Sequence, residues 1–356
     1  MSHNTWTTRS IATERRTYCR PKNGRLETWD EVVDRAFLKH QRRLWEEAQG
    51  KELAPHQEAE LQELASLGRQ KKSLLAGRTL WLGGTEYAHT RALCNYNCSF
   101  NTVHSIYDLV DTGWNLLNGV GTGVTPSSGI LQGYRKSVAT IEIIPSEQPG
   151  DYKGRENNVE TPPCSSNGYV WTIAVGDSAQ AWAKAVGKLF KVYPRVDKLV
   201  LDYSEVRGPG KRLKNYAWIC NGWKPLGDAM SAMHAIRNKR AGSLLTEIDI
   251  LDVVNLFGTV LSSRRAAEAM LLDARHPRAQ EFVEAKVDYW RKGLDHRRQS
   301  NNSITFWQKP SRAELASLLE VAFENGEPGF VNAAGALAKC PWWKGCLLYT
   351  SPSPRD

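Results

Sequence analysis

Cysteine is the residue type in this sequence that could most directly do redox chemistry. Cys94 and Cys98 form a C-x3-C pair in ALCNYNCSF. No second cysteine or histidine pair lies at zinc-ligand spacing, so a metal site at this pair is disfavoured. Cys98 is therefore either a redox-active thiol or a small buried hydrophobic side chain. The seven cysteines, an odd number scattered along 356 residues, are untypical of a disulfide-stapled secreted domain, so we expect reduced thiols.

Two loops could bind phosphate or sugar oxygens. In NGVGTGVTP, Gly119, Gly121 and Gly123 would let a ligand approach the backbone, because glycine has no Cβ. The spacing is not G-x-G-x-x-G, and an ordinary helix-ending turn is the alternative. In SEVRGPGKRLKNY, basic side chains surround a Gly-Pro-Gly turn and could bind a nucleoside triphosphate, unless the loop is merely solvated. These side chains are Arg207, Lys211, Arg212 and Lys214.

Asp177 and Ser178 follow an apolar stretch and precede a helical pattern, so they are either ligand-binding residues or a helix N-cap. The histidines show neither H-x3-H nor H-E-x-x-H spacing, and the sequence has no G-x-S-x-G or Walker A motif. Hydrolase and P-loop functions are therefore disfavoured.

The elements that must position these residues alternate between helix and strand. Apolar spacing predicts helices over about 29–37, 56–67, 106–117, 182–190, 248–261 and 312–323, and β-branched stretches predict strands over 138–144, 169–175, 199–203 and 303–307. Capping boxes begin the first and last helices, at Thr28 with Glu31 and at Ser311 with Glu314. The strand over 169–175, the helix over 182–190 and the strand over 199–203 together predict a β-α-β unit. Parallel strands bind ligands at their carboxyl ends, so we expect chemistry after Val175 and after Tyr203.

Composition places the chain among folded globular proteins, with 41% hydrophobic and 24% charged residues. Lysine and arginine number 47 against 38 acidic residues, and this net charge of +9 favours partners that carry phosphate. We find neither a signal peptide nor an apolar stretch of 18 residues, so we expect no membrane association and a cytoplasmic location. Residues 346–356, CLLYTSPSPRD, look like the translation of a sequencing adapter and are excluded from the fold.

Several strings taken together resemble the adenosylcobalamin-dependent, class II ribonucleotide reductases, and within them the monomeric type that reduces ribonucleoside triphosphates. They occur in the family's order between about residues 14 and 332. The strings are RRTYCRPKNGRLETWDEVVDR, GRTLWLGGTE, YNCSF, LLNGVGTGV, VGDSAQAW, LDYSEVRGPGKRLK, HRRQSNNSITF and NGEPGFVN.

The resemblance implies an α/β fold, in which an N-terminal helical region is followed by the first half of a ten-stranded α/β barrel. We expect the helical region over 1–75, the partial barrel with effector-binding segments over 76–345, and a non-native tail over 346–356. The implied reaction replaces the ribose 2′-hydroxyl with hydrogen through a thiyl radical, with adenosylcobalamin supplying the radical. The implied partners are a ribonucleoside triphosphate substrate, a deoxynucleoside triphosphate effector and a thioredoxin-like reductant of a monomeric enzyme.

By this resemblance Cys98 is the first member of a redox-active cysteine pair, and Asn97 and Gly121 approach the substrate. The loop from Arg207 to Lys214 would pass effector identity to the substrate base, with Asp177 and Ser178 assigned to the same effector site. Two loops depart from the family pattern: YAWICNGWKP replaces a stretch ending Ala-Ser-Gly-Pro, and Ser262 and Ser263 replace Gly-Asn before Arg264 and Arg265.

The Asn-x-Cys-x-Glu string that holds the family's thiyl cysteine is absent, and Cys340 in AKCPWWKG does not match it. The thiyl cysteine, the second redox cysteine and most of the cobalamin site would lie in a further part of the protein. We therefore expect this polypeptide to be catalytically inactive and, because a half barrel exposes sheet edges, poorly soluble.

Two alternatives come from other classes. The charge and 13 tryptophans could indicate a single-stranded nucleic-acid-binding protein, although most tryptophans fall in patterns typical of the core: Trp29, Trp171, Trp182, Trp290 and Trp307. We therefore expect no nucleic-acid partner. A glycyl-radical reductase with a related barrel is the second alternative. The downstream sequence would distinguish it from a cobalamin-dependent reductase.

Overall fold

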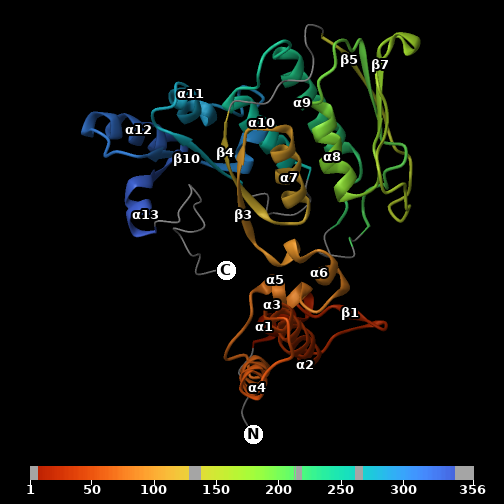
Figure 1. Ribbon diagram of the computed structural model, residues 1–356, viewed down its shortest axis with the longest axis vertical. Coiled ribbons are helices and arrows are strands. Elements are labelled where there is room, and N and C mark those ends of the chain that lie inside the picture. Colours follow the sequence, from red (N-terminus) through yellow and green to blue (C-terminus); the bar gives the residue numbers. More distant parts are fainter. Residues whose placement is uncertain (1–6, 128–137, 212, 214–218, 261–267, 341–356) are drawn as a thin grey trace. The chain divides into compact units, whose positions relative to one another are not determined.

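The computed structural model describes residues 7–127, 138–211, 213, 219–260 and 268–340. The predictions made at Arg212, Lys214, 262–265 and 346–356 lie outside these residues. The described chain forms two compact units, one ending at Asn97 and the other beginning at Cys98 (Figure 1).

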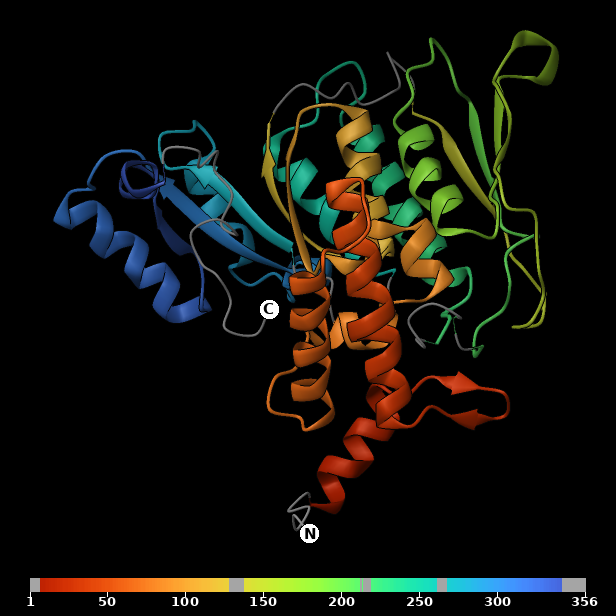
Figure 2. The same ribbon diagram turned by 60° about the horizontal axis from the view of Figure 1, so that its bottom comes forward.

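The N-terminal unit is mainly helical. Its elements are α1 (Thr8–Thr17), the hairpin β1 (Pro21–Lys22) and β2 (Arg25–Leu26), α2 (Trp29–Val33), a π-helical segment (Asp34–His40), α3 (Gln41–Gln49), α4 (Pro55–Arg69), α5 (Gly77–Leu82), α6 (Glu86–Thr90) and a 3₁₀ turn (Ala92–Asn95). Both hydrogen bonds of the predicted capping box at Thr28 are present. The chain from α2 into α3 lies beside α4 (Figure 2), where the Phe37 ring packs against Gly68.

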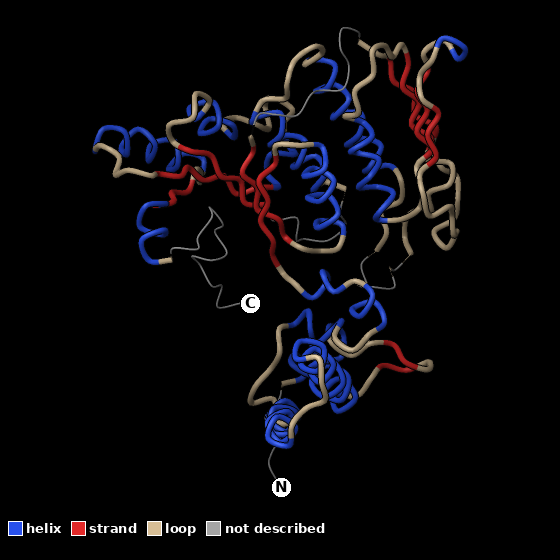
Figure 3. Tube along the Cα trace, viewed as in Figure 1, coloured by secondary structure: helices blue, strands red, loops and turns tan. Residues whose placement is uncertain are grey.

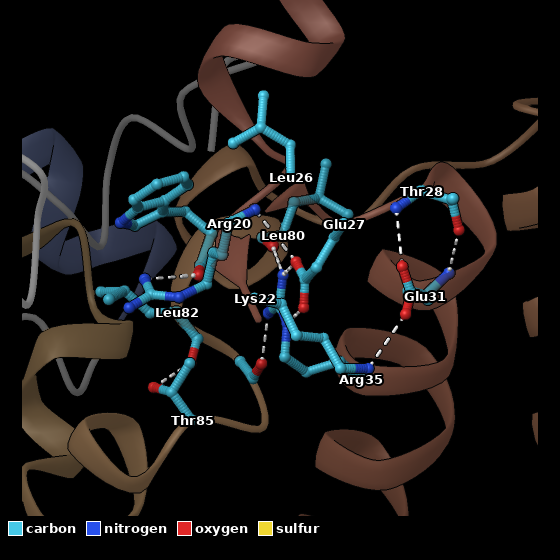
Figure 4. A network of polar contacts seen from close by, with 12 residues as sticks. Arg20, Lys22, Leu26, Glu27, Thr28, Glu31, Arg35, Leu80, Leu82 and Thr85 are labelled. Atoms are coloured by element: carbon cyan, nitrogen blue, oxygen red, sulfur yellow. Dashed lines mark hydrogen bonds and ion pairs between the residues drawn. The ribbon is translucent and has the colours of Figure 1, made fainter. Parts of the chain in front are cut away.

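A buried ion pair joins the hairpin of this unit to its helices (Figure 4). The Glu27 carboxylate accepts from Arg35 Nε and Nη2, both at 2.8 Å, and from the Arg20 backbone N–H at 3.1 Å. Arg35 also donates to the carbonyl of Leu80 in α5 and to that of Gly83 just after α5. Burial opposes ionisation of Glu27, but these hydrogen bonds outweigh it and hold the pKa of Glu27 below its usual value.

The second unit contains a parallel sheet with strand order β11-β10-β9-β4-β3. Its strands are β3 (Cys98–Val103), β4 (Gly121–Pro126), β9 (Glu268–Asp273), β10 (Ser300–Phe306) and β11 (Gly329–Asn332). One face packs against α7 (Ile106–Leu117) and α10 (Glu247–Gly258), through apolar residues such as Val124, Met270 and Ile304. Every residue of α10 is buried, so this helix is the core of the unit.

A second sheet of the same unit has the order β5-β8-β7-β6. Its elements are β5 (Thr140–Ile144), β6 (Val159–Thr161), β7 (Val170–Ala174), α8 (Ala179–Leu189), β8 (Lys198–Asp202) and α9 (Lys224–Lys239). β7 and β8 pair in parallel across α8, so the predicted β-α-β unit is confirmed. Helices α8 and α9 lie on one face of the sheet, where Trp171 and Leu199 are fully buried (Figures 1 and 3).

The remaining elements are α11 (Ala279–Val283), 3₁₀ turns at Ser165–Asn167, Glu284–Lys286 and Asp295–Gln299, α12 (Arg312–Asn325) and α13 (Ala333–Lys339). The capping box at Ser311 and the left-handed Gly326 that ends α12 confirm the predicted helix. Its apolar stripe is only partly buried, however: Leu318 packs against the core, but Leu319 is 48% and Phe323 90% exposed.

Two tryptophans predicted as core residues are exposed, Trp290 by 54% and Trp307 by 43%. The prediction was wrong because Trp290 lies in a turn, not on a helix, and Trp307 comes one residue after β10 ends. Trp171 is fully buried, as predicted. The predicted α/β class with parallel sheets is confirmed, and no helix in the described part of the chain is long and apolar enough to cross a membrane.

Candidate functional site

Cys98 begins β3, and the parallel register places it directly opposite Gly121, the first residue of β4. Two residues predicted to belong to one site, far apart in sequence, are thus neighbours at the amino ends of adjacent strands. The positions where we expected the chemistry, after Val175 and after Tyr203, follow strands of the other sheet. The Cys98 side chain is exposed, so its interpretation as a small buried hydrophobic residue is wrong.

Alternation along β3 separates the neighbours of Cys98 onto two faces. Ser99 and Asn101 face α7: Asn115 Nδ2 donates to Ser99 Oγ at 3.1 Å, and Asn101 Nδ2 donates to the Asp108 carbonyl at 3.0 Å. Cys98 therefore lies on the face away from α7. A reactive thiol on this face is not buried among the apolar side chains that pack against α7 and α10.

The face that carries Cys98 also carries Phe100 of β3 and Gly121 and Gly123 of β4. The Phe100 ring lies over β4, and a Cβ at Gly123 would lie 2.5 Å from Phe100 Cδ2. The same face continues onto β10 with Asn301 and Ser303, according to the strand register. The face is therefore mixed, because Phe100 also packs against a small apolar cluster that contains Leu271 and Val331.

The predicted effector residues lie on the other sheet, at the carboxyl ends of β7 and β8. Arg207 Nε donates to both oxygens of Asp177, at 2.9 and 3.0 Å, so the two loops are joined by an ion pair. The Asp177 side chain is only 4% exposed. Ser178 is the N-cap of α8: its Oγ accepts from the Ala181 backbone N–H at 3.0 Å and donates to the Glu156 carbonyl at 2.7 Å. The N-cap interpretation of Ser178 is confirmed, and its effector role stays a prediction.

The basic loop does not present all of its charge to solvent. Arg207 is neutralised by Asp177, whereas the Lys211 side chain is 59% exposed and lies 4.0 Å from Asp151. The loop is closed at its base by backbone hydrogen bonds from Gly210 to the Cys220 carbonyl and from Cys220 to the Lys211 carbonyl. Of the two described basic residues of this loop, Lys211 is thus the more exposed.

The departure YAWICNGWKP has a structural consequence in its described part. Trp223 stacks on Tyr203 with ring centroids 5.6 Å apart, and its Nε1 donates to the Ser146 carbonyl at 3.1 Å. Tyr203 is fully buried, which raises its pKa far above the usual value, so its ring serves here as a neutral packing surface. The two ends of the loop are thus held together by aromatic stacking.

Sequence reasoning missed the segment 146–157, which packs against both effector loops. The Glu205 carboxylate accepts from Tyr152 Oη at 3.1 Å and from the Arg155 backbone N–H at 3.3 Å. The Gly154 backbone N–H donates to Asp177 at 3.4 Å. The available signal was a pair of glycines four residues apart after a predicted strand, Gly150 and Gly154, which permit close backbone contact.

A cobalt cofactor needs metal-binding side chains or a large cavity in the protein. Among the described residues, no group of three or more His, Cys, Asp or Glu side chains could hold a metal ion. A cavity of about 560 Å³ lies beside β10 and β11, but its lining includes Phe306, Leu315, Phe330 and Val331 and no metal donor of these types. The described residues alone do not form a site for adenosylcobalamin.

Fold and site together define an α/β protein with parallel sheets and an exposed thiol at the start of a strand. No family model matches the chain. It is 25% identical over 369 residues to the adenosylcobalamin-dependent ribonucleoside-triphosphate reductase of Lactobacillus helveticus. This match covers 92% of this chain and 49% of the relative. The same enzyme of Lactobacillus leichmannii is 26% identical over 375 residues, with 92% and 48% covered.

A solved structure, the crystal structure of a B-12 dependent (class II) ribonucleotide reductase, shares the fold with a TM-score of 0.68. Its identity is 22%, and the match covers 90% of this chain and 49% of that one. The resemblance to adenosylcobalamin-dependent ribonucleotide reductases is thus confirmed along nearly the whole chain. The chain spans about half the length of the curated relatives it matches.

Proposed function

We propose that this chain is the front part of an adenosylcobalamin-dependent reductase that converts ribonucleoside triphosphates to 2′-deoxyribonucleoside triphosphates. The observation that carries the proposal is the pairing of Cys98 with Gly121 at the start of two adjacent parallel strands. It occurs in a chain that is similar over 92% of its length to enzymes of that name. The glycyl-radical reductase and the nucleic-acid-binding protein have no comparable support.

In this proposal Cys98 is one of two thiols that supply the reducing equivalents. Both thiols are oxidised to a disulfide, which delivers two electrons and two protons, and the 2′-hydroxyl leaves as water. The second thiol must come within about 2 Å of Cys98 Sγ when the bond forms. The exposure of Cys98 at the start of β3 is compatible with such an approach. Asn97 and Gly121 would contact the substrate.

Adenosylcobalamin would supply the radical that starts the reaction when it is bound. Because the described residues do not form its site, we assign this chain the tasks of positioning the sugar and providing one thiol. A thioredoxin-like protein would reduce the disulfide afterwards. We also propose that the whole enzyme acts as a monomer in the cytoplasm.

The effector site is proposed at the carboxyl ends of β7 and β8. A deoxynucleoside triphosphate there would contact the loop that carries Arg207 and Lys211, with Asp177 and Ser178 on the neighbouring loop. The exposure of Lys211 and the engagement of Arg207 by the Asp177 carboxylate favour Lys211 as the phosphate contact.

The finer fold proposed is half of a ten-stranded barrel. Five parallel strands of the described chain form one sheet, and β11 and β3 are its outer strands. Leu319, Phe323 and Phe330 are exposed in and near α12 and β11, where further strands and helices would cover them.

The test is to express the complete reading frame and measure formation of dCTP from CTP with adenosylcobalamin and a dithiol. We expect turnover that depends on both additions, and none from the 356-residue chain alone. Turnover by the 356-residue chain, or cobalamin-independent turnover by the complete protein, would overturn the proposal.

A further inference from the structure

Three connections meet at the carboxyl end of the four-stranded sheet, and we call them the three-loop assembly: residues 146–157 after β5, 176–178 after β7 and 204–211 after β8. The strand order β5-β8-β7 places the connection after β8 between the other two. Its neighbours therefore decide what position the loop 204–211 can adopt.

Glycines let these loops contact each other backbone to backbone. A Cβ at Gly154 would overlap the Glu205 carbonyl oxygen, and a Cβ at Gly208 would overlap the Gln148 carbonyl oxygen. At Gly150 it would lie 2.7 Å from the Pro209 carbonyl oxygen. None of these three glycines has a positive φ, so they are needed for close approach and not for an unusual backbone conformation. The segment 146–157 thus interlocks with the loop 204–211.

Polar contacts join the same loops. Glu205 accepts from Tyr152 Oη at 3.1 Å and from the Arg155 N–H at 3.3 Å, and Asp177 accepts from Arg207 Nε and from the Gly154 N–H. Desolvation and the Glu205 carboxylate raise the pKa of Tyr152, which keeps the phenol protonated and able to donate. Ser146 Oγ donates to the Val206 carbonyl at 2.5 Å. The loop 204–211 cannot shift without breaking contacts to the segment 146–157.

We propose that Glu205 is a positioning residue which, through Tyr152 and the Arg155 backbone, makes the segment 146–157 part of the nucleotide-discriminating apparatus. This inference rests on the proposed function, because it deepens the role of the loop 204–211 in nucleotide choice. The carboxylate acts through the loop and does not itself contact the nucleotide. Changes in the segment 146–157 should therefore alter which nucleotide is preferred.

The first experiment measures backbone hydrogen exchange on the 356-residue chain and on Tyr152→Phe, Glu205→Gln and the double variant. Loss of one hydrogen bond to a charged group should speed exchange about tenfold in both 146–157 and 204–211. The effects of the two single changes should not add in the double variant, since both weaken the same contact between Tyr152 and Glu205. Glu142→Gln, which alters the exposed ion pair with Lys198 on β5 and β8, is the matched control and should leave exchange unchanged.

The second experiment measures equilibrium binding of dATP, dGTP, dCTP and dTTP to the same proteins. We expect Glu205→Gln and Tyr152→Phe to change the ratio between the tightest and weakest nucleotide at least threefold, while Glu142→Gln keeps it. Far-ultraviolet circular dichroism verifies that each variant is folded.

The two experiments separate the inference from the proposed function. If the parent chain binds none of the four nucleotides, the proposed effector site of this chain is wrong, and exchange still tests the coupling. If exchange in 146–157 stays at the parent rate in Glu205→Gln, or if nucleotide ratios are unchanged although exchange rises, the positioning role of Glu205 is overturned.

Discussion

Asp252 of the buried helix α10 anchors the turn that leads into β10, and its removal gives a quantitative prediction. Its carboxylate accepts from Arg297 Nε at 2.6 Å, from Arg297 Nη2 at 2.7 Å and from His296 Nε2 at 2.9 Å. The side chains of all three residues are at most 13% exposed. Removing one partner of a buried pair leaves the other charge uncompensated, which costs about 3–5 kcal/mol. We predict this loss of unfolding free energy for Asp252→Ala.

The same carboxylate should make stability depend on pH. Burial opposes ionisation of Asp252, but the hydrogen bonds from Arg297 and His296 outweigh it, so its pKa in the folded protein lies below its usual value. A lowered folded pKa contributes stability that is present above the unfolded pKa of about 3.9 and is lost as the pH falls below it. Asp252→Ala should therefore flatten the stability profile between about pH 4 and the folded pKa.

Urea unfolding followed by circular dichroism measures both effects. Asp228→Asn is the control, because its pair with Lys224 is more than 60% exposed on both sides and should contribute less than about 1 kcal/mol. If Asp252→Ala lowers the free energy of unfolding by less than about 1 kcal/mol, the reasoning about the buried cluster is refuted, because an uncompensated buried Arg297 should cost more than that. An unchanged acid limb of the profile would refute the assignment of the pH dependence to Asp252.

Three further predictions concern other parts of the chain. Burial is the main cause that lowers the pKa of His40, and the positive charges of Arg43 and Arg35 lower it further. The N-terminal unit should therefore lose stability as the pH falls below about 6.5, and thermal melts of His40→Phe should show a smaller loss. Gly123→Val should push on the Phe100 ring, separate β3 from β4 and lower the unfolding free energy of the second unit, measured in urea, by about 2 kcal/mol or more. Gly293→Val is the comparison, because the added Cβ has no atom within 4 Å and introduces only the strain of a positive φ. Replacing Leu319 and Phe323 with lysine should lower the aggregation of the 356-residue chain in light scattering, and aggregation equal to that of the parent would show that this stripe is not the adhesive surface.

Local sequence signals predicted individual elements well. Thr28 with Glu31 and Ser311 with Glu314 start helices because each capping box satisfies backbone groups within four residues. The helix over 106–117 was predicted at the residues that the structure assigns to α7. Such features depend on neighbours in sequence, so a single sequence contains them.

Contacts between distant segments were harder to predict. The resemblance placed Cys98 and Gly121 in one site, but only the strand register shows that they pair directly. Glu205 and Tyr152 lie 53 residues apart, and Tyr152 belongs to none of the strings that carry the resemblance. The apolar stripe of α12 indicated a buried helix face, yet Phe323 is exposed, because the period of a helix does not say whether a partner covers it.

The role of Cys98 is tested most directly by single substitutions in the complete protein. Cys98→Ser should lower the steady-state formation of deoxynucleoside triphosphate by at least about a thousandfold, because a hydroxyl cannot donate electrons by forming a disulfide. Cys164→Ser removes another exposed thiol, in the loop between β6 and β7, and should keep activity within about twofold of the parent. Equal activity of Cys98→Ser and Cys164→Ser would contradict the central claim that Cys98 is a redox thiol at the substrate.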